Sequence, residues 1–283
     1  KRLMEKKKIR LYLGIDPTAP RLHLGHTIGM RKLQEFADLG CEVFLVVGTG
    51  TVLAGDPSLR EEARKKISKE EVVRNIKTWK RQAGKILDFS KINIRYNGDW
   101  LLKLKLDDII DIASNISAIK LFQRDSFRRR VKKGDTVWMH EVLYPLLQGY
   151  DSVHLKVDLE IGGSDQVFNM LIGRELERKM IGKEKFVLTF PMINGIDGKP
   201  MSKTSGNCVW IEDSPNEMYG KIMSIPDELI FSYFELMADT SLSEIANLKR
   251  SKANPKDLKI KLAKEIVKIY HGEKAAQKAA AEF

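Results

Sequence analysis

The sequence predicts an α/β protein with a parallel β-sheet in its amino-terminal part and only helices in its carboxyl-terminal part. Short apolar runs alternate with amphipathic stretches up to about residue 190, which is typical of strands joined by helices. Helical patterns alone follow Ser214. Apolar residues make up 43% of the 283 residues, enough for one large core or for a large and a smaller one.

The first elements form a strand–helix–strand unit. Residues 9–15 read as a short buried strand that is closed by the Pro-rich turn DPTAP. Residues 27–39 have the apolar spacing of a helix, which Gly40 would end. Residues 42–47, EVFLVV, form a second buried strand. Because a helix joins the two strands, we expect them to be parallel.

The remaining elements follow from the same patterns. Helices are expected over residues 69–87, 106–131 and 165–180, with a further helical stretch at 142–147. Strands are expected over residues 91–97, 153–159 and 186–190. The capping sequences DSPNE and DTSLSE open helices after residue 213, so we place a domain boundary near Glu212.

Charge and cysteine content limit the classes of function. The net charge of +11 suggests an anionic partner such as nucleic acid, although a lysine-rich proteome would explain it equally well. No run is long enough to span a membrane. Cys41 and Cys208 form neither a disulfide framework nor a zinc motif, which favours a reducing, cytoplasmic setting.

Two histidines and a glycine follow the first turn, in the stretch RLHLGHTIGM. Ligands of parallel sheets bind outside the carboxyl ends of the strands, and a helix N-terminus attracts phosphate. His23 and His26 are three residues apart and could donate hydrogen bonds to phosphate together, while Gly25 would let a flat ligand approach. For one histidine alone, a core position would be the better interpretation.

A second candidate site is the stretch GKPMSKTSGN, residues 198–207. Small and polar residues surround Lys199 and Lys203, so the loop could close over a polyphosphate. An ordinary surface turn explains the composition equally well.

Several motifs together resemble a known family. HLGH after DPTAP, and PMSKT much later, resemble the two signatures of class I aminoacyl-tRNA synthetases. With GDPS, LYPLLQGYDS and IGGSDQVFNMLIGREL, the chain resembles the bacterial tyrosyl-tRNA synthetases over most of residues 11–225. The resemblance implies a Rossmann-like catalytic domain and the joining of tyrosine to AMP, followed by transfer of the tyrosyl group to tRNA(Tyr).

The resemblance also implies how the phosphates are bound. The tyrosine carboxylate attacks the α-phosphate of ATP, so the protein needs no nucleophile and acts by positioning and charge stabilisation. His23, His26, Thr18 and Lys203 are the implied phosphate contacts. Mg²⁺ accompanies ATP without a dedicated protein metal site, and no tightly bound cofactor is expected. Further nucleotide contacts are implied at the following positions: Gly14, Asp16, Gly25, Gly163, Asp165 and Met201.

The implied amino-acid pocket is the most specific expectation. Tyr12 and Asp151 would bind the substrate phenol, and phenylalanine would leave them buried and unpaired. Tyrosyl-tRNA synthetases are known to discriminate against phenylalanine by a factor of about 10⁵. Tyr144, Gln148 and Asp56 would hold the ammonium group, and Gln166 would help to place the carboxylate.

Some of these residues have a purely structural alternative. Tyr12 and Tyr144 could be core residues, and Asp151 could be a turn residue. Asp165 could cap the helix that follows, and this role is compatible with nucleotide binding. Met201 could be a packing residue.

The domain organisation implied by the resemblance has three parts. Residues 1–212 form the catalytic domain, with a dimerisation segment inserted at about residues 100–140, and residues 213–283 form a helical domain. We expect a homodimer without membrane contact. Family members carry a further small RNA-binding domain that this chain does not include.

The sequence departs from the family in the second signature, where Pro200 replaces a lysine and Thr204 a serine. Three other functions remain open at this stage. A tryptophanyl-tRNA synthetase should not need the phenol-binding acid Asp151. Another nucleotidyltransferase with the histidine signature would be a compact single domain. A synthetase-like RNA-binding protein without activity would not need intact His23, His26 and Lys203.

Overall fold

The computed structural model describes residues 3, 5, 8–58, 67–202, 205–251 and 253–283. The chain divides into two compact units. The first consists of Lys1–Pro20, Arg31–Lys77 and Leu87–Pro191. The second consists of Arg21–Met30, Thr78–Ile86 and Met192–Phe283, so the first signature and the carboxyl-terminal helices belong to the same unit.

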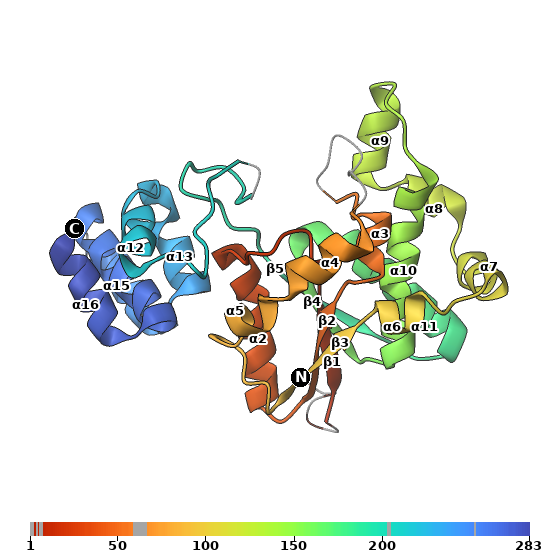
Figure 1. Cartoon of the computed structure of the whole chain (residues 1–283), viewed down its shortest axis with the longest axis horizontal. Coiled ribbons are helices and arrows are strands. Elements are labelled where there is room, and N and C mark those ends of the chain that lie inside the picture. Colours follow the sequence, from red (N-terminus) through yellow and green to blue (C-terminus); the bar gives the residue numbers. More distant parts are fainter. Residues whose placement is uncertain (1–2, 4, 6–7, 59–66, 203–204, 252) are drawn as a thin grey trace. The chain divides into compact units, whose positions relative to one another are not determined.

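A five-stranded parallel sheet forms the centre of the first unit (Figure 1). Its strands are β1 (Arg10–Ile15), β2 (Glu42–Val47), β3 (Ile92–Tyr96), β4 (Leu159–Gly163) and β5 (Phe186–Phe190). The spatial order is β3-β2-β1-β4-β5, so the order reverses between β1 and β4. Ligands of such sheets bind where this reversal occurs.

Helices connect the strands along the chain. They are α2 (Leu24–Asp38), α3 (Thr51–Ala54), α4 (Lys69–Ile76), α5 (Trp79–Ala83), α6 (Gly98–Leu101), α7 (Leu106–Ser114), α8 (Ala118–Phe122), α9 (Asp125–Lys132), α10 (Met139–Leu155) and α11 (Val167–Ile181). Helices α10 and α11 pack closely where two glycines face each other. A Cβ on Gly149 would lie only 3.0 Å from the Cα atom of Gly173.

The second unit carries a helical array after the short antiparallel bridge between His23 and Trp210. Its helices are α12 (Pro215–Met223), α13 (Ile230–Met237), α14 (Leu242–Arg250), α15 (Pro255–His271) and α16 (Glu273–Glu282), with a 3₁₀ turn, η2, at Asp227–Leu229. Ser214 begins α12 with a capping box that includes Glu217, as the sequence predicts.

The structure confirms the predicted α/β class and the parallel sheet. It differs from the prediction of a strand at residues 153–159, because residues 153–158 are not part of a strand. Val153 and Leu155 end α10 with buried side chains, and the strand begins only at Leu159. The alternating pattern was misleading because β4 is buried along its whole length and therefore does not alternate.

Two predicted helices are divided into shorter ones. Residues 69–87 form α4 and α5, and residues 106–131 form α7, α8 and α9. Helix α2 begins at Leu24, three residues before the predicted start, so Gly25 and His26 lie in its first turn and His23 directly precedes it. No helix among the described residues is long and apolar enough to cross a membrane.

Candidate active site

Polar side chains of the first unit gather where the strand order reverses. Asp16 follows β1 directly, and the 3₁₀ turn η1 (Ser164–Gln166) follows β4. β1 and β4 are neighbours in the sheet, so their carboxyl ends bring Asp16 and Asp165 to the same edge. This is the edge at which the sequence predicts nucleotide contacts.

Tyr12 and Asp151 are both deeply buried, with exposed fractions of 1% and 2%. Asp151 accepts hydrogen bonds from Asn97 Nδ2 at 3.0 Å and from Trp100 Nε1 at 2.9 Å. Burial raises the pKa of Asp151 well above its usual value, and these two donors oppose the rise. Burial, together with the charges of Glu160 and Asp151, also raises the pKa of Tyr12. Tyr12 is therefore a neutral phenol beside a buried carboxyl group.

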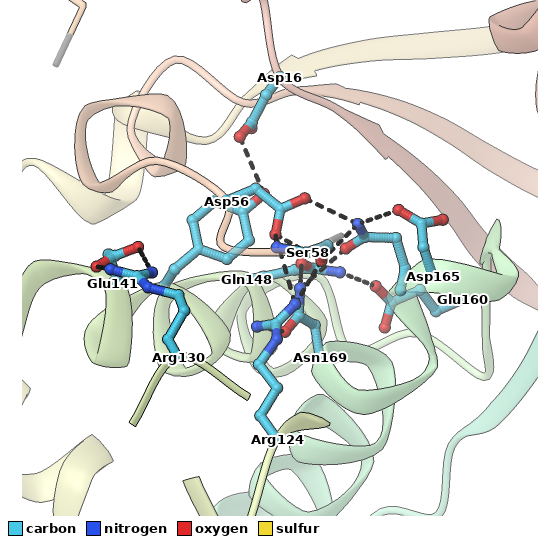
Figure 2. A network of polar contacts seen from close by, with 12 residues as sticks. Asp16, Asp56, Ser58, Arg124, Arg130, Glu141, Gln148, Glu160, Asp165 and Asn169 are labelled. Carbon is cyan, nitrogen blue, oxygen red and sulfur yellow. Dashed lines mark hydrogen bonds and ion pairs between the residues drawn. The ribbon is translucent and has the colours of Figure 1, made fainter. Parts of the chain in front are cut away.

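Three residues expected around the ammonium and carboxylate groups of the substrate, Asp56, Gln148 and Gln166, form one hydrogen-bonded network (Figure 2). Gln166 Nε2 donates to Asp56 Oδ2 at 2.8 Å and to Asp165 Oδ2 at 2.9 Å. Asn169 Nδ2 donates to Gln148 Oε1 at 3.0 Å and to Gln166 Oε1 at 2.9 Å. The structure thus brings these predicted residues together, with Asn169 as the link.

Tyr144 is the exception within this group, since its hydroxyl donates to Asp16 Oδ2 at 2.9 Å. Asp16 Oδ1 also accepts from Thr51 Oγ1 at 2.7 Å. A residue expected at the amino acid is therefore bonded to one expected at the nucleotide. This contact and the hydrogen bond from Gln166 to Asp165 connect the two predicted halves of the site.

Asp165 lies in η1 and is mostly buried. Burial raises the pKa of its carboxyl group, the hydrogen bond from Gln166 lowers it, and the charge of Asp56 raises it further. Gly163 ends β4, and Gly14 lies on β1 two residues after Tyr12. The nearest atom to a Cβ on Gly14 would be 3.7 Å away, so packing within the chain does not require glycine there. Thr18 donates its backbone N–H to Asp16 O at 2.8 Å.

A buried arginine, Arg124, reaches the same network from the turn before α9. Its guanidinium donates to Asn169 Oδ1 at 2.8 Å and to Ser58 Oγ, and lies 3.6 Å from Asp56 Oδ1. Burial lowers the pKa of Arg124, and the charge of Asp56 opposes this change. Figure 2 shows the guanidinium pointing toward Ser58 and Asn169.

A large cavity of about 810 Å³ opens beside Arg124. Arg128, Arg129 and Lys132 of α9 line it, together with Asp165. The cavity is therefore mainly basic and reaches the predicted nucleotide contact.

The two histidines belong to the second unit. Their ring centroids lie 3.8 Å apart, and both side chains are half-buried. Gly25 N donates to His23 Nδ1 at 3.1 Å, and His23 N donates to His26 Nδ1 at 3.2 Å. A Cβ on Gly25 would lie 2.9 Å from the His23 ring, so a glycine is needed for the position of this ring.

The second signature also lies in this unit. Asn207 holds the base of its loop, because its side chain accepts from Ser202 N at 2.9 Å and donates to Asp197 Oδ1 at 2.7 Å. Met201 is buried, with an exposed fraction of 7%. Lys203, the predicted phosphate contact, lies outside the described residues, as does Thr204.

Sequence reasoning missed four residues of the first-unit network, namely Asn97, Trp100, Asn169 and Arg124. Asn97 directly follows β3, and strand ends of this kind position ligand-binding groups. Asn169 follows Gln166 by three residues at the start of α11, so both side chains lie on one helical face. Arg124 had no comparable signal, since it stands in a run of basic residues that also fits a solvated face.

Fold and site together define a class of protein. The chain matches the family model described as tRNA synthetases class I (W and Y) over residues 4–283. It belongs to this family.

The relatives narrow the class. The tyrosine–tRNA ligase of Thermotoga maritima is 45% identical over 287 residues, which cover 100% of this chain and 72% of the relative. Tyrosine–tRNA ligase 2 of Vibrio cholerae is 44% identical, with the same shares covered. Both names specify tyrosine.

Solved structures share the fold. A C-terminally truncated mitochondrial tyrosyl-tRNA synthetase of Aspergillus nidulans has a TM-score of 0.84 at 22% identity, covering 99% of this chain and 86% of that one. A tryptophanyl-tRNA synthetase of Campylobacter jejuni has a TM-score of 0.62 at 19% identity, covering 98% and 89%. The similarity to the tyrosyl structure is therefore the greater of these two.

Proposed function

We propose that this chain is a tyrosine–tRNA ligase, which forms tyrosyl-AMP from tyrosine and ATP and then transfers the tyrosyl group to tRNA(Tyr). The observation that carries the proposal is the buried Asp151, which is held by Asn97 and Trp100 and lies beside Tyr12. A phenol donates to the carboxyl group and accepts from the tyrosine hydroxyl. An indole or phenyl ring would leave at least one of these groups unpaired, which is costly in a buried site.

The substrate ammonium binds among Asp56, Tyr144 and Gln148, and Gln166 orients the carboxylate. The network supports these roles because Asn169 connects Gln148 to Gln166, and Gln166 is bonded to Asp56. Side chains that are fixed in this way hold the carboxylate in position for attack on the α-phosphate. Positioning of this kind replaces a protein nucleophile.

ATP is bound, in this proposal, by the residues that the resemblance implies. His23, His26, Thr18 and Lys203 contact the phosphates, and the following residues contact the nucleoside or approach it: Gly14, Asp16, Gly25, Gly163, Asp165 and Met201. The position of Gly25 and His26 in the first turn of α2 supports phosphate binding, since the positive end of the helix dipole attracts anions. Mg²⁺ enters with ATP and is held by phosphate oxygens.

The basic cavity beside α9 receives the 3′ end of the tRNA. Arg124, Arg128, Arg129 and Lys132 would neutralise phosphates along its wall, and Asp165 lies at the same cavity. This places a polyanion-binding surface next to the predicted adenylate. Transfer of the tyrosyl group requires that proximity.

The chain forms a homodimer through the segment at residues 100–140. Among the described residues, nine of the twenty exposed large apolar side chains fall in this segment, including Leu106, Ile119 and Met139 at 69–73% exposure. An apolar cavity of about 290 Å³ adjoins it, lined in part by Ile109 and Leu143. Apolar surface concentrated in this way marks an interface.

The dimer is tested by Ile110→Lys in α7, with Val73→Lys in α4 as the control, since the two side chains are similarly exposed. Sedimentation velocity should show a monomer for Ile110→Lys and a dimer for the control. A dimer in both variants would place the interface elsewhere.

We keep the division into a catalytic domain at 1–212 and a helical domain at 213–283 as part of the proposal. The two free cysteines are buried, which suits a reducing compartment, and we place the enzyme in the cytoplasm.

The test of the proposed function is amino-acid-dependent exchange of labelled pyrophosphate into ATP. We expect exchange with tyrosine, only weak exchange with phenylalanine and none with tryptophan. Exchange with tryptophan would show a tryptophanyl enzyme instead. No exchange from the folded protein would indicate an RNA-binding protein without activity, and binding of tRNA would then be the function to measure.

A further inference from the structure

A buried ion pair lies behind the predicted tyrosine pocket. Lys185 directly precedes β5, and its ammonium donates to Glu160 Oε2 on β4. The two side chains are 0% and 3% exposed. Lysine is rarely buried to this extent unless its charge has a specific partner. No role in binding or catalysis has so far been given to either residue.

The packing of α10 against α11 leaves space for this ammonium. A Cβ on Gly173 would lie 2.7 Å from Lys185 Nζ and 3.1 Å from Ser152 Oγ. The glycine therefore admits the lysine and the serine side by side. The position of Lys185 therefore depends on the close packing of the two helices at this glycine.

The ammonium group determines the direction of a hydrogen-bond chain that leads to Tyr12. Lys185 Nζ can only donate, and it donates to Ser152 Oγ at 2.7 Å. Ser152 Oγ lies 3.1 Å from the Tyr12 hydroxyl. The hydrogen of the Ser152 hydroxyl needs an acceptor, and among the described residues Tyr12 is the one within hydrogen-bond distance. We assign Ser152 as the donor to Tyr12, because its hydrogen bond lowers the pKa of the phenol, as a donated hydrogen does. The hydrogen of Tyr12 then remains available for another acceptor.

Glu160 is the competing acceptor for that hydrogen, since its carboxylate lies close to the Tyr12 hydroxyl. Lys185 occupies one of its oxygens, and Gln148 Nε2 donates to the other at 3.0 Å. The ammonium thus neutralises the carboxylate and reduces its hold on the Tyr12 hydrogen. The same ion pair orients Gln148, a predicted tyrosine-binding residue.

We propose that Lys185 is a positioning residue for amino-acid specificity, which acts through Ser152 to make the Tyr12 hydroxyl a donor to the phenolic oxygen of the substrate. The substrate hydroxyl in turn donates to Asp151. A ligand must then accept and donate at one atom, which a phenol does and a phenyl ring does not. This inference rests on the proposed function and adds the groups that orient its pocket.

The first test is Ser152→Ala, which removes the link but leaves the Lys185–Glu160 pair in place. We expect the KM for tyrosine in pyrophosphate exchange to rise about three- to tenfold, the effect of one neutral hydrogen bond. The KM for ATP, the kcat and the weak use of phenylalanine should not change. Ser126→Ala is the matched control, because Ser126 is also buried and its hydroxyl has no partner among the described residues.

A double-mutant cycle with Tyr12→Phe separates this role from a general packing effect. If Ser152 acts through the Tyr12 hydroxyl, Ser152→Ala should add nothing in the Tyr12→Phe background. Additive effects on the KM for tyrosine, or equal losses with tyrosine and phenylalanine, would overturn the inference.

The role of Lys185 itself is tested in the double variant Lys185→Met with Glu160→Gln, which avoids leaving a buried charge unpaired. Once circular dichroism shows that it is folded, its preference for tyrosine over phenylalanine should fall at least as far as in Ser152→Ala. A wild-type preference would contradict the inference while leaving the proposed function intact. Absence of tyrosine-dependent exchange in the wild-type protein would instead refute the proposed function.

Discussion

The predicted amino-acid pocket and the predicted phosphate-binding groups are built in different ways. Tyr12 and Asp151 are almost completely buried, and hydrogen bonds connect them to residues on other strands and helices. His23 and His26 are half-buried, and their rings lie 3.8 Å apart at the start of one helix. The first group is fixed by the core of its unit, whereas the second is fixed by a local turn.

This difference matches two chemical tasks. Rejection of phenylalanine needs polar groups that would stay buried and unpaired, because the cost of an unmade hydrogen bond is greatest away from water. Phosphates change geometry during the reaction and need donors that can follow the developing charge. We therefore expect substitutions in the pocket to change amino-acid use, and substitutions at the histidines to change the rate.

The largest effect is expected for Asp151→Asn, which keeps the shape of the side chain but removes the carboxylate. The loss of one charged hydrogen bond should lower kcat/KM for tyrosine about 100-fold and leave the KM for ATP unchanged. Steady-state pyrophosphate exchange measures both constants. An unchanged KM for tyrosine would mean that the phenol binds elsewhere, and that Asp151 does not belong to the amino-acid pocket.

His26→Ala should give the complementary result. Loss of one phosphate donor should lower the rate of tyrosyl-AMP formation at least about tenfold, with little change in tyrosine affinity. Rapid-quench single-turnover measurements would show this, with His271→Ala in α15 of the same unit as the control. A rate close to the wild-type rate would remove His26 from the chemistry.

Asn97→Ala sharpens the comparison within the pocket. Asn97 donates to Asp151 Oδ2, and it also donates to Thr51 Oγ1 at 3.0 Å. Without it, Asp151 keeps the donor Trp100, so the KM for tyrosine should rise only about fivefold. A loss as great as that of Asp151→Asn would show that Asn97 itself binds the substrate.

The smallest effect on activity is expected for Glu177→Gln, at the far end of α11. Glu177 is buried, and neither carboxylate oxygen has a hydrogen-bond partner among the described residues. Burial raises its pKa from 4.5 to about 7. Since the folded-state pKa is raised, its stabilising contribution is complete below about pH 4.5 and is lost as the pH rises through 7.

The free energy of unfolding of the wild-type protein should therefore fall, relative to Glu177→Gln, between pH 5 and pH 8. The rise in the pKa of Glu177 corresponds to a change in the free energy of unfolding of at most about 3 kcal/mol. Urea denaturation at the two pH values measures it. Parallel pH profiles for the two proteins would show that Glu177 is not neutral in the folded state.

Much of the fold could be predicted because local patterns determine it. The strands at 42–47 and 186–190 agree with the structure, since short apolar runs between turn signals are typical of strands, whether buried as in β2 or at the exposed edge as in β5. The fully buried β4 was misplaced because its pattern has no period. The breaks between α7, α8 and α9 accompany the packing of Phe127 and Leu121 in one core cluster. Such packing cannot be predicted from the local sequence.

The candidate site was predictable where a motif exists and not where only the fold brings residues together. The predicted residues Asp56, Gln148 and Gln166 do form one network. Their partner Arg124 and the pair of Lys185 with Glu160 come from distant positions in the chain. Neither contact could be predicted from the sequence, because the partners of a buried ion pair have no characteristic separation along the chain.

The most direct test of this account is equilibrium dialysis of labelled tyrosine and phenylalanine against the wild-type protein without ATP. Because the buried pocket is already assembled in the first unit, tyrosine should bind alone and phenylalanine at least about 100-fold more weakly. If tyrosine bound only in the presence of ATP, or if both amino acids bound with similar dissociation constants, Tyr12 and Asp151 would not be the groups that select the substrate.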